Sequence, residues 1–419
     1  MRRAARLAGG VTAALVLLSP SAAAAADIQD GLWYYNDTGL ADIHQTVTGS
    51  GVQIALIDSV VNPAAADLVG TALSTHEPSY CAEQEGGPAL PATSATPDAR
   101  HTTSMVSLMI GTGAGTNGEP GVLGVAPGAS VRVYAKQIDE GSCPAPAEAP
   151  TGTHATIPDA VAEGADIVVV TGTMSVLPED VVDAVRAGVI VVASAGNDGG
   201  SITGLPAAYN GVVATGTVDA SGALYGGSPS GARLGVVAPG VDTRSMDPTY
   251  SYYGTTSGSS NSAAFTAGAL ALAVSAFPEA TSNQILQALI RSTDGSLHDP
   301  SHSDTRGYGA VDIRQLLATE PTTYPDVNPF VTDQPGDEPA AEAFGLVDTE
   351  PTQEPSEPSS IPTEGPAEVE PEGFPVLAIA GVAALVVVLI GTATAIVLTG
   401  RRRRRLTTEH AHDGGSPHG

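Results

Sequence analysis

Four residues in the sequence are of types that could perform chemistry together. Asp58 ends an apolar strand-like run, and His101 stands just ahead of an apolar helical run. A second apolar run leads into Asn197 in a Gly-bounded turn, and Ser260 opens an Ala-rich stretch after a turn of small residues. An acid, a histidine and a serine are the residue types of nucleophilic acyl transfer, and an amide can stabilise the oxyanion that forms.

Each of these residues also has an ordinary structural explanation. A strand-terminal Asp58 is often a turn or cap residue, and the chain has eight histidines besides His101. Asn197 fits a simple turn, and Ser260 fits a helix N-cap. The chemical interpretation therefore depends on all four residues occurring in the order Asp, His, Asn, Ser on one scaffold.

The scaffold that must position them alternates between strands and helices over residues 27–319. A helix is predicted to begin at Pro178, because Pro and the acids that follow it favour a first helical turn, and to end at Gly188. Strand, helix and strand with short connections predict an α/β domain whose parallel sheet is covered on both faces. Sites in such sheets form at the carboxyl ends of the strands. The predicted strands are 52–57, 131–135, 166–170, 189–193, 212–218 and 234–237, and further helices are predicted over 260–277 and 282–291.

The combination resembles the subtilisin-like serine proteases, the subtilase family. ALIDSV around Asp58 is similar to the family's aspartate strand, and His101-Thr102-Thr103 is similar to its His-Gly-Thr motif. ASAGND around Asn197 is similar to its Asn segment, and Gly258-Ser259-Ser260 is similar to its Gly-Thr-Ser motif. Similar linking segments occur in the same order, so the resemblance covers about 45–315. It implies a subtilisin-like three-layer fold with a mainly parallel central sheet.

The resemblance also implies a serine-type endopeptidase with roles for these residues. Ser260 would attack the scissile carbonyl, and His101 would take its proton and later give it to the leaving amine. Asp58 would hold the imidazole in the right tautomer and stabilise the imidazolium. Asn197 and the Ser260 backbone N–H would bind the oxyanion.

Several positions depart from the family pattern. Val60 and Thr102 replace glycines near the aspartate and after the histidine, and 167–173 lacks the usual Asn-x-Ser-x-Gly sequence. Asn261, Ala264 and Phe265 stand where the family usually has Met, Pro and His. These departures leave open a second hypothesis, a weak or inactive subtilase-fold protein that is a structural part of a secretion complex. A lipase-like hydrolase is disfavoured, because Gly258-Ser259-Ser260 is not a G-x-S-x-G elbow.

Charge divides the chain into parts. The formal net charge is −28, and residues 27–319 hold only nine of the 17 basic residues, so nucleic acid is excluded as a partner. Residues 320–373 contain 14 acids, 11 prolines and no Lys or Arg, which predicts a disordered, extended linker.

Both ends of the chain predict export and membrane anchoring. Residues 1–26 have the basic, apolar and small-residue regions of a signal peptide, although an uncleaved N-terminal helix is the alternative. Residues 374–400 are predicted to form a transmembrane helix, since 376–399 carry no charge. The tail 401–419 opens with five arginines, which favours a cytoplasmic location over nucleic-acid binding. The catalytic domain is therefore expected outside the cytoplasm, on a single-pass cell-membrane protein.

This architecture resembles the mycosins, membrane-anchored subtilases associated with type VII secretion in actinobacteria. The resemblance implies protein or peptide substrates and type VII secretion components as partners. Only 31 residues separate Asp27 from Asp58, which is too short for a separate pro-domain of the usual subtilisin kind. Residues 27–50 are therefore expected to pack along the domain.

The two cysteines, Cys81 and Cys143, lie in long polar insertions at 76–99 and 139–154. In an exported protein they are most simply one disulfide, with two free thiols as the alternative. No metal or cofactor motif is evident. Subtilases often bind calcium, but no ligands can be assigned in this sequence.

Overall fold

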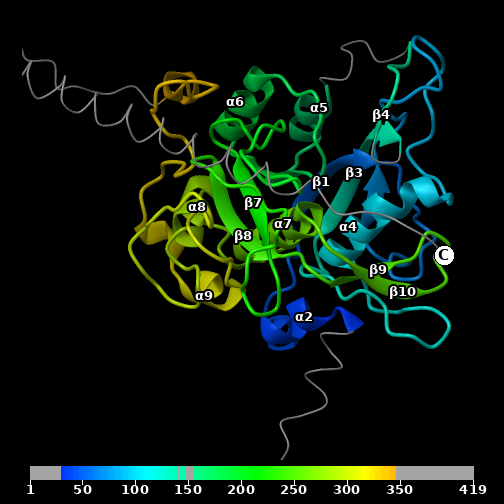
Figure 1. The fold of residues 1–419 in the computed structure, drawn as a ribbon, viewed down its shortest axis with the longest axis horizontal. Helices are drawn as coiled ribbons and strands as arrows, with labels where there is room; N and C mark the ends of the chain where they lie inside the picture. The colour runs from blue at the N-terminus through cyan, green and yellow to red at the C-terminus, as the bar shows by residue number, and fades with distance from the viewer. Residues whose placement is uncertain (1–29, 139–140, 148–154, 346–419) are drawn as a thin grey trace, which may run out of the picture. The chain divides into compact units, whose positions relative to one another are not determined.

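The computed structural model describes residues 30–138, 141–147 and 155–345 (Figure 1). The predicted signal peptide, transmembrane helix and basic tail lie outside these residues, as does the later part of the predicted linker. Within the described ranges, no helix is both long and apolar enough to cross a membrane.

A mainly parallel sheet lies at the centre of the domain. Its strand order is β2-β3-β1-β5-β6-β7-β8, all paired in parallel, and β4 pairs with β3 in the antiparallel direction. Strands β9 and β10 form a separate antiparallel hairpin. The predicted α/β class is confirmed. The strands are β1 (Gln53–Ser59), β2 (Leu73–Thr75), β3 (Ser130–Ile138), β4 (Gly141–Ser142), β5 (Ile167–Val170), β6 (Ile190–Ser194), β7 (Val213–Val218), β8 (Leu234–Pro239), β9 (Thr243–Met246) and β10 (Tyr253–Thr256).

Helices cover both faces of this sheet, because successive side chains of a buried strand point to opposite faces. On β1, Ile54 and Leu56 join the core that contains α4 and α7, whereas Ala55 and Ile57 join the core that contains α5 and α6. The helices are α2 (Trp33–Asp37), α3 (Leu40–Ile43), α4 (Arg100–Ile110), α5 (Thr156–Ala162), α6 (Pro178–Arg186), α7 (Ser259–Ala276), α8 (Ser282–Leu289) and α9 (Ile313–Ala318), with short 3₁₀ turns η1 (Pro97–Ala99), η3 (Pro321–Thr323) and η4 (Ala341–Phe344).

Helix α7 runs through the interior and packs against β5, β6, β7 and β8 as well as α4. From Ser259 to Ala273 its side chains are buried around the whole helix, except for the half-buried Ser260, and most of them are apolar, as this burial requires. Its small residues allow close backbone approach: a Cβ at Gly268 would lie 2.7 Å from the Cβ of Val125. This packing fixes the helix start, and with it Ser260, relative to the sheet.

Residues 30–50 pack into the domain, as the sequence predicts for this segment. The buried Trp33 donates its indole N–H to the Val241 carbonyl at 2.9 Å. The fully buried Tyr34 donates its hydroxyl to the Leu123 carbonyl at 2.6 Å. Arg244 ties the start of the segment to the β9–β10 hairpin, since its guanidinium donates to the Asp30 carbonyl at 2.8 Å. The segment is therefore an integral part of the core.

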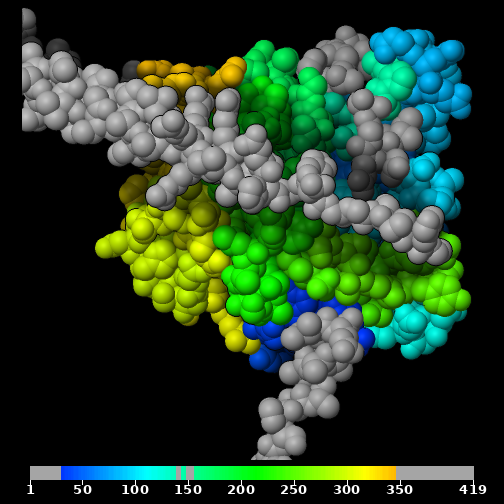
Figure 2. Space-filling view, in the orientation of Figure 1, coloured from blue at the N-terminus to red at the C-terminus, as the bar shows by residue number. Residues whose placement is uncertain are grey.

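The predicted boundary at residue 320 differs from the structure, which packs residues 320–345 onto the domain. Phe330 is buried and meets the Tyr308 ring edge-on, and Arg233 forms an ion pair with Asp337. Buried Asn210 donates its amide to the carbonyls of Thr332 and Pro339. Acid and proline content predicted an extended chain, but a few anchoring side chains are enough to hold this segment. Figure 2 shows the last described residues, in orange, against the green surface that includes α6.

The predicted disulfide between Cys81 and Cys143 is confirmed. It joins the insertion that leads toward α4 to the segment that follows β4. It closes 62 residues of chain, a span for which a cross-link stabilises a fold by about 2–4 kcal/mol.

Phe330→Ala should lower the free energy of unfolding by about 3 kcal/mol, because it removes a buried aromatic ring that holds the 320–345 segment. Val327→Ala is the matched control in the same segment; Val327 is 41% exposed and should change stability by less than about 0.5 kcal/mol. Urea unfolding of both variants measures the difference. Equal, small effects would mean that the segment contributes no stability.

Candidate active site

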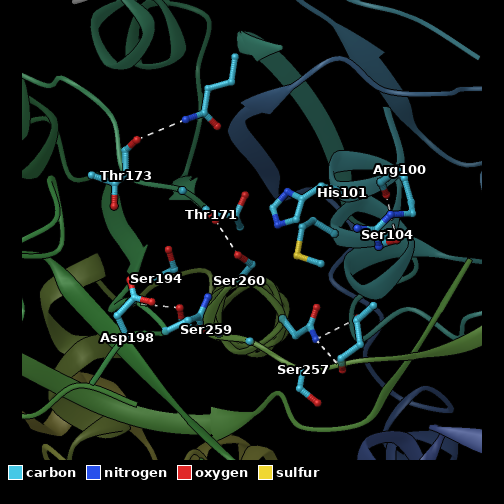
Figure 3. Close-up of a pocket in the computed structure, with 18 residues that line it drawn as sticks. Arg100, His101, Ser104, Thr171, Thr173, Ser194, Asp198, Ser257, Ser259 and Ser260 are labelled. Carbon is cyan, nitrogen blue, oxygen red and sulfur yellow. Dashed lines mark hydrogen bonds between the residues drawn. The ribbon is translucent and has the colours of Figure 1, made fainter. Parts of the chain in front are cut away.

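The carboxyl edge of the sheet gathers all four residues singled out in the sequence. Asp58 lies near the end of β1, and Asn197 follows β6. His101 is the second residue of α4, and Ser260 is the second residue of α7. His101, Asn197 and Ser260 line one pocket of about 640 Å³, and Asp58 lies buried directly behind His101. Figure 3 shows His101, Ser260 and Thr171 around this pocket.

Asp58 and His101 form the most direct contact of the site. The imidazole Nδ1 lies 3.1 Å from one Asp58 carboxylate oxygen and 2.9 Å from the other. Asp58 is 1% exposed, and it also accepts the Ser59 N–H at 2.6 Å and the Thr171 hydroxyl. Burial raises the pKa of Asp58, but the charge and hydrogen bond of His101 and the bonds from Thr171 and Ser59 outweigh burial and lower the pKa below its usual value. The carboxylate therefore stays ionised and orients the imidazole.

A register shift in the sheet lies beside Asp58. Asp58 pairs with Ala135, but the next residue, Ser59, pairs with Gln137, so Lys136 is an extra residue on β3. Such bulges redirect side chains and are common next to active sites. Here the shift brings Gln137 to the pocket, where its side-chain N–H donates to the Thr173 carbonyl at 3.3 Å.

Ser260 lies at the N-terminus of the buried α7. Its hydroxyl donates to the Thr171 carbonyl at 2.6 Å, and Thr171 in turn donates its own hydroxyl to Asp58. Thr171 therefore contacts both the serine and the buried acid. The Ser260 proton must turn from the Thr171 carbonyl to the imidazole before the histidine can accept it.

Asn197 is fixed to the start of α7 by a reciprocal pair of bonds. Its side-chain oxygen accepts the Ser259 N–H at 2.8 Å, and the Ser259 hydroxyl accepts the Gly196 N–H at 3.1 Å. Because the oxygen is used in this way, the Asn197 amino group is left as the donor that can face the pocket. The first N–H groups of a helix have no partner within the helix, so the Ser260 N–H is a second donor near the same point.

One wall of the pocket is the segment after β5, which Lys136 supports from behind. Lys136 is 5% exposed, and its ammonium group donates to the Ser175 carbonyl at 2.5 Å. Burial lowers the pKa of Lys136 to about 8, against the opposing charge of Asp180. The only lysine of the chain is thus a support for the cleft wall.

Sequence reasoning missed three contributors to the site. The first is Thr171, which donates to Asp58, and the second is Ser259, whose N–H holds Asn197. The third is the pair of hydroxyl groups of Ser59 and Thr102, which bond to each other beside Asp58 and His101. The sequence did show Thr102 as a departure from the family motif. Its hydrogen bond to Ser59 could not be predicted, because the distance between two hydroxyl groups in space does not follow from their separation in the sequence. Within the described ranges, no group of three or more His, Cys, Asp or Glu could hold a metal ion.

Comparisons with known proteins agree with this geometry. The sequence matches the profile of the subtilase family over residues 49–310. Subtilisin E from Bacillus subtilis (strain 168) is 32% identical over 257 residues, which cover 58% of this chain and 61% of that protein. Subtilisin DY from Bacillus licheniformis is 31% identical over 259 residues, which cover 58% of this chain and 84% of that protein. This chain thus spans about three fifths of the first relative's length.

A solved structure shows the same fold. The crystal structure of fervidolysin from Fervidobacterium pennivorans, described as a keratinolytic enzyme related to subtilisin, superposes with a TM-score of 0.52. The match covers 70% of this chain and 47% of that chain at 22% identity. At this identity the likeness bears on the fold alone.

Lys136 gives the stability of the domain a specific pH dependence. The folded pKa, about 8, lies below the ordinary 10.5, so between these values the unfolded chain binds a proton that the folded chain does not. The contribution of Lys136 to stability must therefore rise with pH through this window. Relative to Lys136→Met, the wild type should gain about 1–3 kcal/mol between about pH 7.5 and 10 in urea unfolding. Lys136→Arg stays charged throughout and should parallel Lys136→Met; a wild-type curve parallel to both would contradict the lowered pKa.

Proposed function

Because the chain belongs to the subtilase family, we propose that it is a serine endopeptidase that cleaves protein or peptide substrates outside the cytoplasm. The observation that carries the proposal is the contact between Asp58 and His101 in a cleft that Ser260 and Asn197 also line. An acid, a base, a nucleophile and an amide donor at one edge of a parallel sheet are the complete set that acyl transfer needs.

The proposed reaction begins with the Ser260 hydroxyl. It leaves the Thr171 carbonyl, gives its proton to His101 and attacks the scissile carbonyl carbon. Asp58 stabilises the imidazolium that forms, because its carboxylate already lies against Nδ1 and is held ionised. The imidazolium then donates its proton to the leaving amine, and water repeats the sequence to release the acyl group from the serine.

The oxyanion of this reaction would be bound at the start of α7. The Asn197 amino group and the Ser260 N–H are its proposed donors, and the Asn197 oxygen is held by Ser259 before any substrate binds. A donor that is oriented in advance costs no reorganisation in the transition state. The positive end of the helix dipole adds to this stabilisation.

We further propose that the domain is held on the outer face of the cell membrane. The uncharged stretch 376–399 and the five arginines after it support a single span with its tail in the cytoplasm. The order of signal peptide, peptidase domain, acidic linker and span resembles the mycosins. It supports type VII secretion components as partners.

The alternative function is that of a weak or inactive subtilase-fold component of such a secretion complex. The observation that favours it is the Ser260 hydroxyl bond to the Thr171 carbonyl, which occupies the nucleophile's proton. The departures from the family motifs around His101 and Ser260 also favour this alternative. The Asp58 and His101 contact argues against it, since a purely structural protein has no need of an oriented imidazole.

A fluorophosphonate probe should label the wild-type protein, because it reacts with a serine whose hydroxyl is activated by a neighbouring base. Ser260→Ala should abolish labelling without a change in unfolding temperature, and Ser259→Ala should keep at least part of it. Labelling is read by mass spectrometry of the modified peptide. A folded wild type that resists the probe would reject the enzyme and leave the structural alternative.

Asn197→Ala should lower kcat by about 10²–10³-fold with little change in KM, because the lost amide acts mainly on the oxyanion of the transition state. The fluorophosphonate should still label this variant, at a lower rate, because Ser260 and His101 remain. Asn283→Ala is the control and should keep full activity, because Asn283 is a half-buried residue of α8 whose side chain bonds to Asp326 and does not line the pocket. Steady-state kinetics on a peptide substrate measure both variants, and an unchanged kcat for Asn197→Ala would exclude the proposed donor.

A further inference from the structure

Two buried hydroxyl groups meet directly behind the contact between Asp58 and His101. The Ser59 and Thr102 side-chain oxygens lie 2.7 Å apart, and both residues are fully buried. Ser59 is the chain neighbour of Asp58, and Thr102 is the chain neighbour of His101. The pair therefore joins the end of β1 to the first turn of α4 at the position where these elements present the acid and the imidazole.

We propose that Ser59 and Thr102 are positioning residues that hold α4 in register with β1 and so fix the alignment of the His101 ring with the Asp58 carboxylate. This inference rests on the proposed function, in which that alignment is used for catalysis. It assigns a role to the threonine at 102, a position where the family motif quoted above has a glycine and no hydroxyl is available.

The hydrogen bonds around the pair account for both hydroxyl protons. Ser59 lies 3.2 Å from the Asp98 carbonyl in η1, the turn that leads into α4. One arrangement satisfies every group: Thr102 donates to Ser59, and Ser59 donates to Asp98. The Ser59 N–H meanwhile donates to Asp58 at 2.6 Å. Ser59 thus bonds to the acid through its backbone and to the helix that carries the histidine through its side chain.

Burial makes this bridge effective. Water does not reach either hydroxyl, so no solvent molecule can replace a lost partner, and an unmade bond there carries its full cost. The bridge also follows the register shift at Asp58, where regular pairing with β3 is interrupted. A point of weaker sheet pairing is where an added tie to α4 has the greatest effect on the position of Asp58.

Thr102→Val and Ser59→Ala test the proposal, because each removes one hydroxyl and keeps similar volume. Each should lower kcat about 3–10-fold and leave KM within about twofold, since the substrate cleft is unchanged. Thr102→Ser keeps the hydroxyl and should retain wild-type kcat. The double variant Thr102→Val with Ser59→Ala should lose no more than the worse single variant, because both act through one bond.

The pH dependence separates positioning from a general loss of structure. A looser carboxylate stabilises the imidazolium less, so the acid limb of kcat/KM should move to lower pH by about 0.3–1 unit in Thr102→Val. Two other charged side chains line the pocket, Arg100 and Asp198, and the variant leaves both in place. Rates are divided by the fraction of sites that a fluorophosphonate titrates, so that unfolded protein does not contribute.

Ser107→Ala is the matched control. Ser107 is a buried serine of the same helix whose hydroxyl has no hydrogen-bond partner among the described residues, so its removal should change neither kcat nor the acid limb. Unchanged kcat and pH profile in both Thr102→Val and Ser59→Ala would overturn the proposal. So would an equal effect in Ser107→Ala, which would indicate general loosening of α4.

A measurement that does not depend on enzymatic activity can test the positioning role separately from the proposed function. NMR titration of the His101 ring follows its protonation midpoint in the full chain, and that midpoint should fall in Thr102→Val and stay in Thr102→Ser. If the wild type does not react with the probe but the midpoint shifts as stated, the proposed function fails and the positioning role stands. A midpoint identical in wild type and Thr102→Val overturns the positioning role.

Discussion

The ionised carboxylate of Asp58 is the constraint on which the rest of the site depends. A buried charge of this kind is tolerated only when hydrogen-bond donors surround it. The donors come from three places: the Ser59 backbone on β1, His101 on α4 and Thr171 after β5. The ends of β1 and β5 and the start of α4 must therefore meet around this carboxylate before it can be buried in its ionised form.

Small side chains make that agreement attainable in a protein with few aromatic residues. Where α4, the segment 121–129 and α7 meet, backbones touch almost directly. A Cβ at Gly124 would lie 2.7 Å from the Ile110 Cα, whereas a Cβ at Gly268 would meet the Val125 side chain at 2.7 Å. Contacts between backbones have no rotamers to relax, so the two helix starts that carry His101 and Ser260 are held more rigidly than long side chains could hold them.

The parts of this molecule that sequence could predict are those with a local signature. Apolar runs predicted β1, β5 and β6, and an Ala-rich run predicted α7. Elements that are buried on all sides have uninterrupted apolar or small residues, which can be recognised in the sequence. Motif order gave the four site residues. Thr171 and the Ser59 and Thr102 bridge could not be predicted, since hydroxyl contacts between distant segments leave no periodicity. Residues 320–345 were predicted as part of a linker because the prediction used the average composition of 320–373. An average does not show that one buried side chain, such as Phe330, can hold the segment on the domain.

The packing of residues 320–345 onto the domain changes the distance over which the peptidase could work. In the proposed anchored protein, residues 346–373 alone would link the domain to the span, and at about 3.1 Å per residue of extended chain they could reach at most roughly 90 Å. The same estimate for 320–373 would give roughly 170 Å. Under the proposed anchoring, this shorter tether would keep the cleft within that distance of the bilayer, so a cleavable bond would have to be presented close to the membrane.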